Sequence, residues 1–228
     1  MKAKNKAKES LIFPRGCRLL KDMDDGDFRR ICECLQAQQL TLRPKETFIF
    51  ESDACRKIGI VIRGAVQISR TRLDGHRNVF ETVGENETFG ATYVFRDVPT
   101  MGVNISAVGE SKVLVFDITK IPHPCHKLCH AHMQFVSNLL AVMSQKIFQV
   151  KQKLRIVSER TIRARLMLFL HIRAKRAKSS EFDIPYNRQA LADFLCVDRS
   201  ALSAEISKLQ KEGVIKVARS HFELVGKF

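Results

Sequence analysis

Residues 195–209 read LCVDRSALSAEISKL and predict a helix with two very different faces. Asp198 is a natural helix N-cap, because its carboxylate can accept hydrogen bonds from the unpaired amides of the first turn. Leu202, Ile206 and Leu209 then recur at the spacing of one buried helical stripe. The other side carries only small, polar or basic residues, namely Ser200, Ser203, Ala204, Ser207, Lys208 and Lys211. Such a face can approach a polyanion closely, because it has neither bulk nor negative charge.

A shorter helix is predicted just before it, over residues 187–195 (NRQALADFL). Asn187 can cap this helix, and Leu191 and Phe194 belong to a short apolar stripe. Residues 196–198 (CVD) then leave room only for a tight turn. Two short helices joined in this way form a helix-turn-helix, whose second helix fits the major groove of DNA.

A small β hairpin is predicted directly after the second helix. Glu212 and Gly213 end that helix, and the stretches VIKV (214–217) and FELV (222–225) flank a turn. The hairpin is expected to be a wing that contacts phosphates through Lys216, Arg219 and His221. The C-terminal part of the chain is therefore expected to be a winged helix-turn-helix.

The composition points to the same class of partner. The chain has 228 residues, enough for two domains, and 45% of them are apolar, which is ample for packed cores. Its formal net charge is +15, and residues 151–228 alone hold 17 Lys and Arg against 8 Asp and Glu. Each basic side chain that neutralises a phosphate releases counterions, so nucleic acid is favoured over a merely solvated basic surface.

The sequence also bears on location. The first residues, MKAKNKAKESLIF, are basic and lack the apolar run of a signal peptide. No segment approaches the roughly 18 to 20 continuous apolar residues that a membrane-spanning helix needs. The seven cysteines show neither a CxxC pair nor the spacing of a disulfide scaffold. We therefore expect a cytoplasmic protein with reduced thiols and no membrane partner.

Residues 40–118 are expected to be β structure, because Val, Ile, Phe and Thr are concentrated there between turn residues. The predicted strand segments are TFIFES (47–52), IGIVIRGAVQISRTR (58–72), RNVFETV (77–83) and NISAVGESKVLVFDI (104–118). Several short strands at this spacing indicate a sandwich or a barrel.

One long helix is predicted over residues 124–157, which contain no Gly and, apart from Pro124, no Pro. Apolar residues follow a heptad spacing at Val136, Leu140, Met143, Ile147, Val150, Leu154 and Val157. This seam is typical of a helix that pairs with a copy of itself, and an ordinary helix packed on its own domain is the alternative. We favour the dimer, because a second apolar edge remains for the chain's own β domain, formed by Phe135, Leu139 and Val142. The following helix is expected to begin at Ser158 as N-cap and to end near 178–181.

This order of parts resembles the Crp/Fnr (cyclic-AMP receptor protein/fumarate-nitrate regulator) family of bacterial transcription factors. The resemblance covers about residues 20–225, and its most specific part is NRQALADFLCVDRSALSAEISKLQKEGVI (187–215). IGIVIRGAVQI (58–68) and GENETFG (84–90) are similar to strands of the family's β roll. The resemblance implies an α+β fold in three parts. These are a cyclic-nucleotide-binding-like β roll that senses an effector and has an N-terminal helical segment (1–123), a dimerisation helix (124–157) and a winged helix-turn-helix that binds DNA (158–228).

The resemblance also implies a homodimer on a pseudo-palindromic operator in double-stranded DNA, with RNA polymerase as a further partner and no enzymatic activity. Arg199 matches the Arg that opens the family's recognition helix, where pairing with guanine is worth roughly 1–3 kcal/mol of discrimination. Ser200 and Ala204 stand where relatives often carry a Glu and a second Arg, so this operator should rely more on DNA shape. Cys196 replaces the usual glycine of the turn, which is expected to be slightly strained. The expected DNA contacts are Arg188, Gln189, Arg199, Ser200, Ser203, Ala204, Ser207, Lys208, Lys211, Lys216 and Arg219.

The sensory half departs further from those relatives that bind cyclic AMP. They carry a Glu just after the Gly of the FGATYVF region (89–95) and an Arg-Ser pair for the cyclic phosphate. This chain has Ala91 at the first place and Met101-Gly102 at the second, with Arg96 as the only base nearby. A buried phosphate without a cationic partner is costly, so we expect another, unidentified small molecule as the effector. The expected pocket residues are Phe89, Gly90, Ala91, Thr92, Tyr93, Arg96 and Met101.

Residues 123–132 (HPCHKLCHAH) form a separate group of potential ligands. On a helix, Cys125 and Cys129 would share one face, as would His126 and His130, and this spacing can hold zinc, copper or haem iron. In the reading that we favour, the thiols pack inward and the imidazoles lie in solvent, so no metal is expected. The alternative is a thiol- or metal-responsive regulator that uses this cluster together with the same DNA-binding half.

Other functions receive less support from the residues. An iron–sulfur cluster is not expected, because Cys17, Cys32 and Cys34 lack the close N-terminal spacing of the family's cluster-binding branch. An enzyme is not expected either, since the chain has no clustered carboxylate pair, no nucleophile motif, no P-loop and no GxGxxG. A general nucleic-acid packaging protein would bind in a salt-dependent way without preferring any operator.

Overall fold

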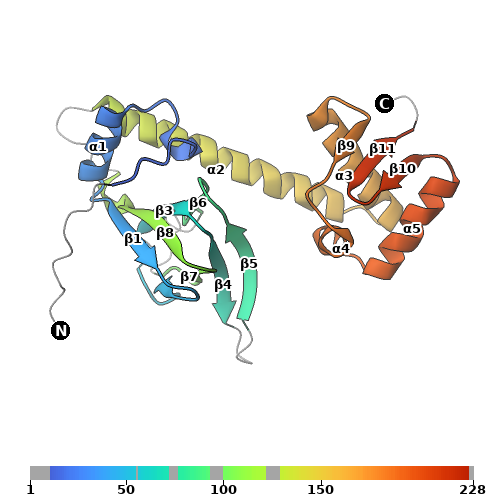
Figure 1. Ribbon diagram of the computed structural model, residues 1–228, viewed down its shortest axis with the longest axis horizontal. Coiled ribbons are helices and arrows are strands. Elements are labelled where there is room, and N and C mark those ends of the chain that lie inside the picture. Colours follow the sequence, from blue (N-terminus) through green and yellow to red (C-terminus); the bar gives the residue numbers. More distant parts are fainter. Residues whose placement is uncertain (1–10, 55, 72–76, 93–99, 122–128, 226–228) are drawn as a thin grey trace. The chain divides into compact units, whose positions relative to one another are not determined.

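A computed structural model describes residues 11–54, 56–71, 77–92, 100–121 and 129–225 (Figure 1). The chain divides into two units, Met1–Gln145 and Lys146–Phe228. Helix α2 (His130–Val157) begins in the first unit and ends in the second. The fold is α+β as predicted, with a β-rich unit, a long helix and a C-terminal unit of helices and a small sheet.

The strands of the first unit form two four-stranded antiparallel sheets in the described residues. One has the order β1 (Gln38–Leu42), β8 (Ser111–Asp117), β3 (Lys57–Arg63) and β6 (Thr88–Phe89). The other has the order β2 (Thr47–Ile49), β7 (Asn104–Ala107), β4 (Val66–Thr71) and β5 (Arg77–Val83). The predicted β segments are confirmed. Two further strands were not among them: β1 precedes the first predicted segment (47–52), and β6 lies between the segments 77–83 and 104–118.

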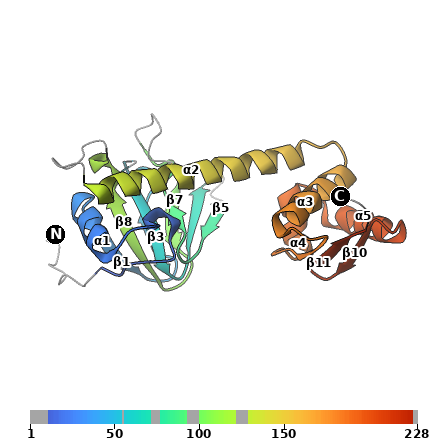
Figure 2. The same ribbon diagram turned by 90° about the horizontal axis from the view of Figure 1, so that it is seen from above.

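Both faces of strand β3 are buried, which explains why its residues are apolar on each face. Ile58 and Ile60 are fully buried in a cluster with the helices of this unit, whereas Val61 lies in the cluster between the sheets. Successive side chains of a strand point to opposite faces, so a sheet covered on both faces needs apolar residues at every position. Figure 2 shows α1 (Asp25–Cys34) and the first part of α2 beside the β1–β8–β3–β6 sheet.

The first part of α2 is held to this unit by its inner face. Phe135 and Leu139 are buried there, and the Phe135 ring lies 5.3 Å from that of Phe116 in β8. Asn138 donates to the backbone carbonyls of Leu19 and Lys21, at 3.1 and 2.7 Å. These contacts confirm the predicted apolar edge at Phe135 and Leu139, and Val142 is half-buried.

The second unit is built from α3 (Ile162–Ala177), α4 (Arg188–Leu195) and α5 (Arg199–Lys211) around one core. A short sheet completes it, with the order β10 (Ile215–Ala218), β11 (His221–Leu224) and β9 (Glu181–Asp183). The two predicted helices, their turn and the hairpin are confirmed. Strand β9 was not predicted, because three residues are too few to show a periodicity. They form a strand because they pair with β11.

The predicted start of the long helix at 124 falls on residues 122–128, which lie outside the described part. α2 is described from His130 onward, and the Cys129 carbonyl just before it accepts from the amides of His132 and Met133. The predicted start of the next helix is wrong. α3 is capped by Thr161 and not by Ser158. The Thr161 hydroxyl accepts from the Ala164 amide at 3.1 Å, whereas the Ser158 hydroxyl donates back to the Leu154 carbonyl.

No helix in the described part of the chain has both the length and the apolar character needed to cross a bilayer.

Candidate nucleic-acid interface

The start of α5 is fixed by its cap. The Asp198 carboxylate accepts from the amides of Ser200 and Ala201 at 2.8 and 3.0 Å, and also from the Ser200 hydroxyl. The hydroxyl of Ser200, followed by these amides, lowers the pKa of Asp198 below its usual range. The predicted N-cap is therefore confirmed, and it leaves Arg199 exposed at the first helical position.

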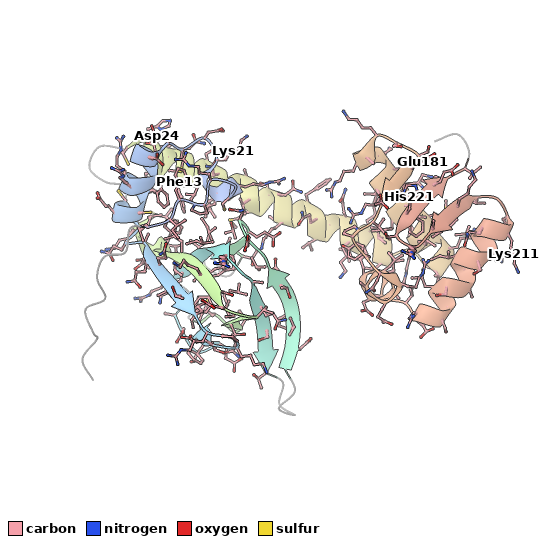
Figure 3. The ribbon with its side chains drawn as sticks, viewed as in Figure 1. Phe13, Lys21, Asp24, Glu181, Lys211 and His221 are labelled. Atoms are coloured by element: carbon pink, nitrogen blue, oxygen red, sulfur yellow. The ribbon has the colours of Figure 1, made fainter. Side chains whose placement is uncertain are left out.

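The two predicted faces of α5 are present in the structure. Leu202, Ile206 and Leu209 are buried in the core. The exposed residues on the other side are Arg199, Ser200, Ala204, Ser207, Lys208 and Lys211, and Ser203 is half-buried. Figure 3 shows Lys211 at the outer end of this helix. The outer face is thus small, polar and basic, as a helix that enters the major groove requires.

Two serine side chains of this face form hydrogen bonds with the backbone of their own helix. The Ser203 hydroxyl donates to the Arg199 carbonyl at 2.9 Å, and the Ser207 hydroxyl donates to the Ser203 carbonyl at 3.0 Å. Their hydroxyl hydrogens are engaged, while their oxygens can still accept a hydrogen bond from a base. Among the predicted contacts on this face, Arg199 has the planar guanidinium that can donate two hydrogen bonds to one acceptor group.

The turn between α4 and α5 has an unusual backbone. Cys196 follows the last residue of α4 with φ 54° and ψ 51°, the left-handed conformation that favours glycine. Its amide completes the end of α4 by donating to the carbonyls of Ala192 and Asp193. Asn187 caps the other end by accepting from the Ala190 amide at 2.8 Å. The strain expected for a residue in place of the turn glycine is present at this position.

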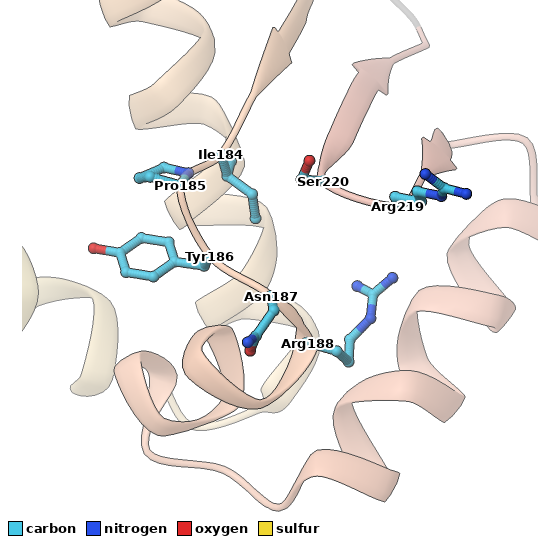
Figure 4. Close-up of a pocket in the computed structure, with 7 residues that line it drawn as sticks. All are labelled: Ile184, Pro185, Tyr186, Asn187, Arg188, Arg219 and Ser220. Carbon is cyan, nitrogen blue, oxygen red and sulfur yellow. The ribbon is translucent and has the colours of Figure 1, made fainter.

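A groove of about 550 Å³ lies beside α4 and the turn of the wing (Figure 4). It is lined by Ile184, Pro185, Tyr186, Asn187, Arg188, Arg219 and Ser220. Arg188 is half-buried against the ring of Phe222, and burial lowers the pKa of its guanidinium below the usual value. Figure 4 shows Arg188 pointing toward the loop that carries Arg219 and Ser220. Two predicted DNA contacts, Arg188 and Arg219, therefore line the same groove.

Two other predicted DNA contacts are already engaged within the protein. The Lys216 ammonium lies 2.8 and 3.0 Å from the carboxylate oxygens of Glu223, its cross-strand neighbour, and this hydrogen bond raises the pKa of Lys216. The Gln189 amide donates to Asp193 at 2.8 Å. Arg219, in the left-handed conformation at the tip of the wing (φ 57°), is exposed.

The segment predicted to form the effector pocket is largely buried. Phe89 and Met101 lie in the cluster between the sheets, and Ala91 lies in the cluster under the helices. Gly90, with φ 84°, brings its Cα so close to the Lys57 carbonyl that a Cβ would lie 2.6 Å from that oxygen. Thr92 is exposed, whereas Tyr93 and Arg96 fall outside the described residues. Cyclic-AMP-binding relatives carry charged or polar groups at two positions of this segment. In this chain the two positions are Ala91 and Met101, which are apolar and buried.

The potential metal ligands near the start of α2 are described only in part. Cys125 and His126 lie outside the described residues. Cys129 is half-buried ahead of the helix, and the exposed His130 places Nδ1 3.2 Å from the Asp27 carboxylate. Within the described segments, no group of three or more His, Cys, Asp and Glu side chains could hold a metal ion. His132 is buried, with Nε2 3.0 Å from the Ile121 carbonyl.

The heptad seam of α2 is an exposed apolar stripe. Leu140, Ile147, Val150 and Leu154 expose between 55% and 68% of their surface. Val136, Met143 and Val157 are half-buried. An apolar stripe this exposed is unusual on a helix that lies in water.

Two arginines of α3 were not among the residues predicted from the sequence. Arg163 forms a bidentate pair with Glu212, the residue that ends α5, at 3.1 and 2.6 Å. The hydrogen bonds between them raise the pKa of Arg163 and lower that of Glu212. Arg165 donates to three backbone carbonyls. No local pattern reveals such roles, because most of the partners lie 30 or more residues further along the chain.

Comparison with known proteins agrees with this geometry. Residues 39–122 match the cyclic nucleotide-binding domain family, and residues 164–225 match the Crp-like helix-turn-helix domain family. The chain is 20% identical over 192 residues to the transcriptional activator protein FnrL of Cereibacter sphaeroides, covering 80% of this chain and 74% of that protein.

Solved structures show the same fold. The catabolite activator protein of Thermus thermophilus is 18% identical, with a TM-score of 0.51, and the match covers 91% of this chain and 93% of that one. The c-di-GMP-responsive global regulator CLP of Xanthomonas campestris is 17% identical, with a TM-score of 0.57 and coverage of 90% and 100%. With a cyclic-nucleotide-binding-type domain followed by a Crp-like helix-turn-helix, the chain belongs to the Crp/Fnr family of transcription regulators, which bind DNA and are not enzymes.

Proposed function

We propose that this regulator acts as a homodimer that reads a pseudo-palindromic operator with α5 of each protomer and responds to a small molecule other than cyclic AMP. The observation that carries the proposal is the exposed face of α5, which is small, basic and headed by Arg199. A face of this kind, presented on a capped helix after a tight turn, fits the major groove.

In this proposal the bases and the phosphates are contacted by different groups. Arg199 pairs with a guanine, and Lys208 and Lys211 contact the flanking backbone. Arg188 and Arg219 hold a phosphate at the groove beside α4, which fixes the register of α5 without reading sequence. Lys216 contributes less, because binding a phosphate would compete with its ion pair to Glu223.

The exposed seam of α2 supports the homodimer. A second copy of the same helix offers a matching apolar stripe, and pairing the two copies removes Leu140, Ile147, Val150 and Leu154 from water. Two recognition helices related by a twofold axis then require two half-sites about one DNA turn apart. RNA polymerase is the expected further partner on the promoter, and the cytoplasm is the expected location.

Packing of the β roll supports an effector other than cyclic AMP. Met101 and Ala91 are buried among apolar side chains, where cyclic-AMP-binding relatives place groups that hold the phosphate and the ribose. The CLP regulator of the same fold is described as responsive to c-di-GMP, so this fold is compatible with other effectors. Binding would shift the population of the dimer toward the arrangement in which both recognition helices fit the operator.

Selection of binding sites from random duplexes by the purified protein tests this proposal. We expect a pseudo-palindrome with half-sites about 10 base pairs apart. Arg199→Ala should lose the preference for one guanine in each half-site, at a cost of roughly 1–3 kcal/mol per contact. Arg176→Ala removes the same charge from the exposed end of α3 and serves as the control. Enrichment of no sequence, or an unchanged preference in Arg199→Ala, would contradict the proposal.

A further inference from the structure

Arg165 joins two parts of the second unit that are distant in sequence. Its side chain, half-buried in the first turn of α3, donates from Nε to the Glu159 carbonyl at 2.9 Å. From Nη1 it donates to the carbonyls of Leu195 and Cys196 at 3.2 and 3.1 Å. Glu159 lies in the linker between α2 and α3, while Leu195 and Cys196 form the end of α4 and the turn before α5. One guanidinium therefore binds the linker and the turn of the helix-turn-helix together.

The chemistry of these partners explains why an arginine occupies the position. The last carbonyls of a helix have no partner within it, and the C-terminal end of a helix carries partial negative charge. A guanidinium is permanently charged and offers five N–H groups in a planar fork, so it can serve several carbonyls at once. A lysine has the same charge but only a single compact ammonium on a flexible stem.

The turn held by Arg165 needs support. Cys196 has φ 54°, a conformation that is costly for any residue with a Cβ and persists only where the surroundings enforce it. Arg165 bonds to the carbonyl of Cys196 itself. Asp198, the cap of α5, follows two residues later, so the shape of this turn sets the direction in which α5 leaves it.

The far end of α5 is held by the same turn of α3. Arg163 pairs with Glu212 through two hydrogen bonds, at 3.1 and 2.6 Å. The end of α2 also contacts this unit, since Ile156 is buried in its core and the Lys153 ammonium lies 5.2 Å from the ring of Phe194 in α4. The start of α3 thus lies between the end of α2 and both ends of the recognition helix.

We propose that Arg165 is a positioning residue for DNA reading: it aims α5 by holding the turn at Cys196, and it ties that turn to the linker after α2. This inference rests on the proposed function of α5. A displacement of the linker at the end of α2 is then passed to the recognition helix through one side chain, although Arg165 itself touches no DNA.

The test compares Arg165→Lys with Arg176→Lys, which makes the same exchange at an exposed site on α3. We expect Arg165→Lys to lose about tenfold in affinity for the selected operator, a change of about 1.4 kcal/mol. Affinity for a scrambled duplex should be unchanged, because the total charge is the same. Arg176→Lys should change neither affinity. An unchanged ratio of specific to non-specific affinity in folded Arg165→Lys, with only a lower unfolding temperature, would overturn the inference.

Amide hydrogen exchange without DNA provides the second measurement. Arg165→Lys should exchange faster both in the linker around Glu159 and at Val197 in the turn, and unchanged exchange at either place would overturn the tie. Adding Cys196→Gly should restore part of the operator affinity, because glycine adopts the left-handed conformation without a penalty. A wild-type protein that prefers no operator would overturn the proposed function instead. The hydrogen-exchange measurement would still test whether Arg165 connects the linker to the turn, because it is made without DNA.

Discussion

At the scale of single residues, the thiols differ sharply in their surroundings. Cys17 and Cys32 are buried in the core under the helices, and burial raises the pKa of both, that of Cys32 to about 12. Cys196 is exposed at the turn before α5. The thiolate is the reactive form, so reactivity requires both access and deprotonation.

We therefore predict that an alkylating reagent at about pH 8 labels Cys196 in the native protein and spares Cys17 and Cys32. Unfolding in denaturant should make all three react at similar rates, because their ordinary pKa values are alike. Peptide mapping by mass spectrometry gives the rate for each thiol. Labelling of Cys32 in native protein as fast as that of Cys196 would contradict the packing described for it.

Some residue roles were predictable from the sequence and others were not. Asn187 and Asp198 were identified as caps, because a cap depends on a few neighbouring residues. Ser158 was chosen wrongly in place of Thr161, because the end of α2 decides which hydroxyl is left to cap the next helix. Arg165 was missed altogether, since nothing near it in sequence indicates carbonyls 30 residues away.

At the scale of elements, the exposed seam of α2 gives the sharpest prediction. Ile147→Glu places two carboxylates opposite each other in the proposed helix pair, and like charges in an interface cost several kcal/mol. We expect the dimer to weaken by about a hundredfold or more, since each factor of ten is about 1.4 kcal/mol. The fold of each unit should be kept, because Ile147 is 55% exposed.

Sedimentation over a range of concentrations measures this change. Gln149→Glu adds the same charge at an exposed position of α2 off the seam and should leave the dimer intact. A wild-type protein that remains monomeric at all concentrations, or an Ile147→Glu variant that remains dimeric, would contradict the assignment of the seam.

The cap of α5 predicts a pH dependence. The pKa of Asp198 is lowered in the folded protein from its ordinary value of 3.8, so the charged carboxylate stabilises the fold. That contribution is complete above the unfolded value and is lost as pH falls through the lower folded value. Asp198→Asn keeps a capping oxygen and removes the titration. Chemical unfolding should show a shallower loss of stability below about pH 4 in the variant, and equal slopes would contradict the role of this carboxylate.

Elements with a strong periodicity were predictable, and those formed by pairing were not. α5, α4 and the β10–β11 hairpin follow from local patterns. Strands β6 and β9 have two and three residues and exist through their partners, β3 and β11, so their own residues give no signal. The heptad in α2 was visible as a spacing, and the structure adds that most of its positions are uncovered within one chain.

At the scale of the whole molecule, charge and shape make separate contributions to binding. The net charge of +15 predicts strong salt dependence, with a slope of about −0.9 for each phosphate neutralised when log affinity is plotted against log salt. Arg219→Ala should reduce the magnitude of the slope by about 1 on any DNA sequence. Lys216→Ala should change it less, because Glu223 already neutralises that ammonium. Titrations by fluorescence anisotropy at several salt concentrations measure both slopes, and an equal change in the two variants would contradict the assignment.

The prediction for the whole molecule depended mainly on the order of its structural segments along the chain. A β-rich segment, a heptad helix and a winged helix-turn-helix together identified the family; the helix-turn-helix stretch was the most specific part, whereas the β-roll stretches alone were weaker evidence. The effector was not predictable to the same degree, because Phe89, Ala91 and Met101 of the segment predicted to form its pocket are apolar and buried. The sequence shows which charged groups are missing at Ala91 and Met101, but an apolar wall has no polar pattern from which to infer a ligand.

The central claim is that the face of α5 around Arg199 reads base pairs, and does so twice in one symmetric complex. Hydroxyl-radical footprinting on the selected operator, combined with the mass of the complex, tests it most directly. We expect two protected patches about one DNA turn apart, with two chains on each duplex. A single asymmetric patch covered by one chain, or protection that is the same on scrambled DNA, would contradict it.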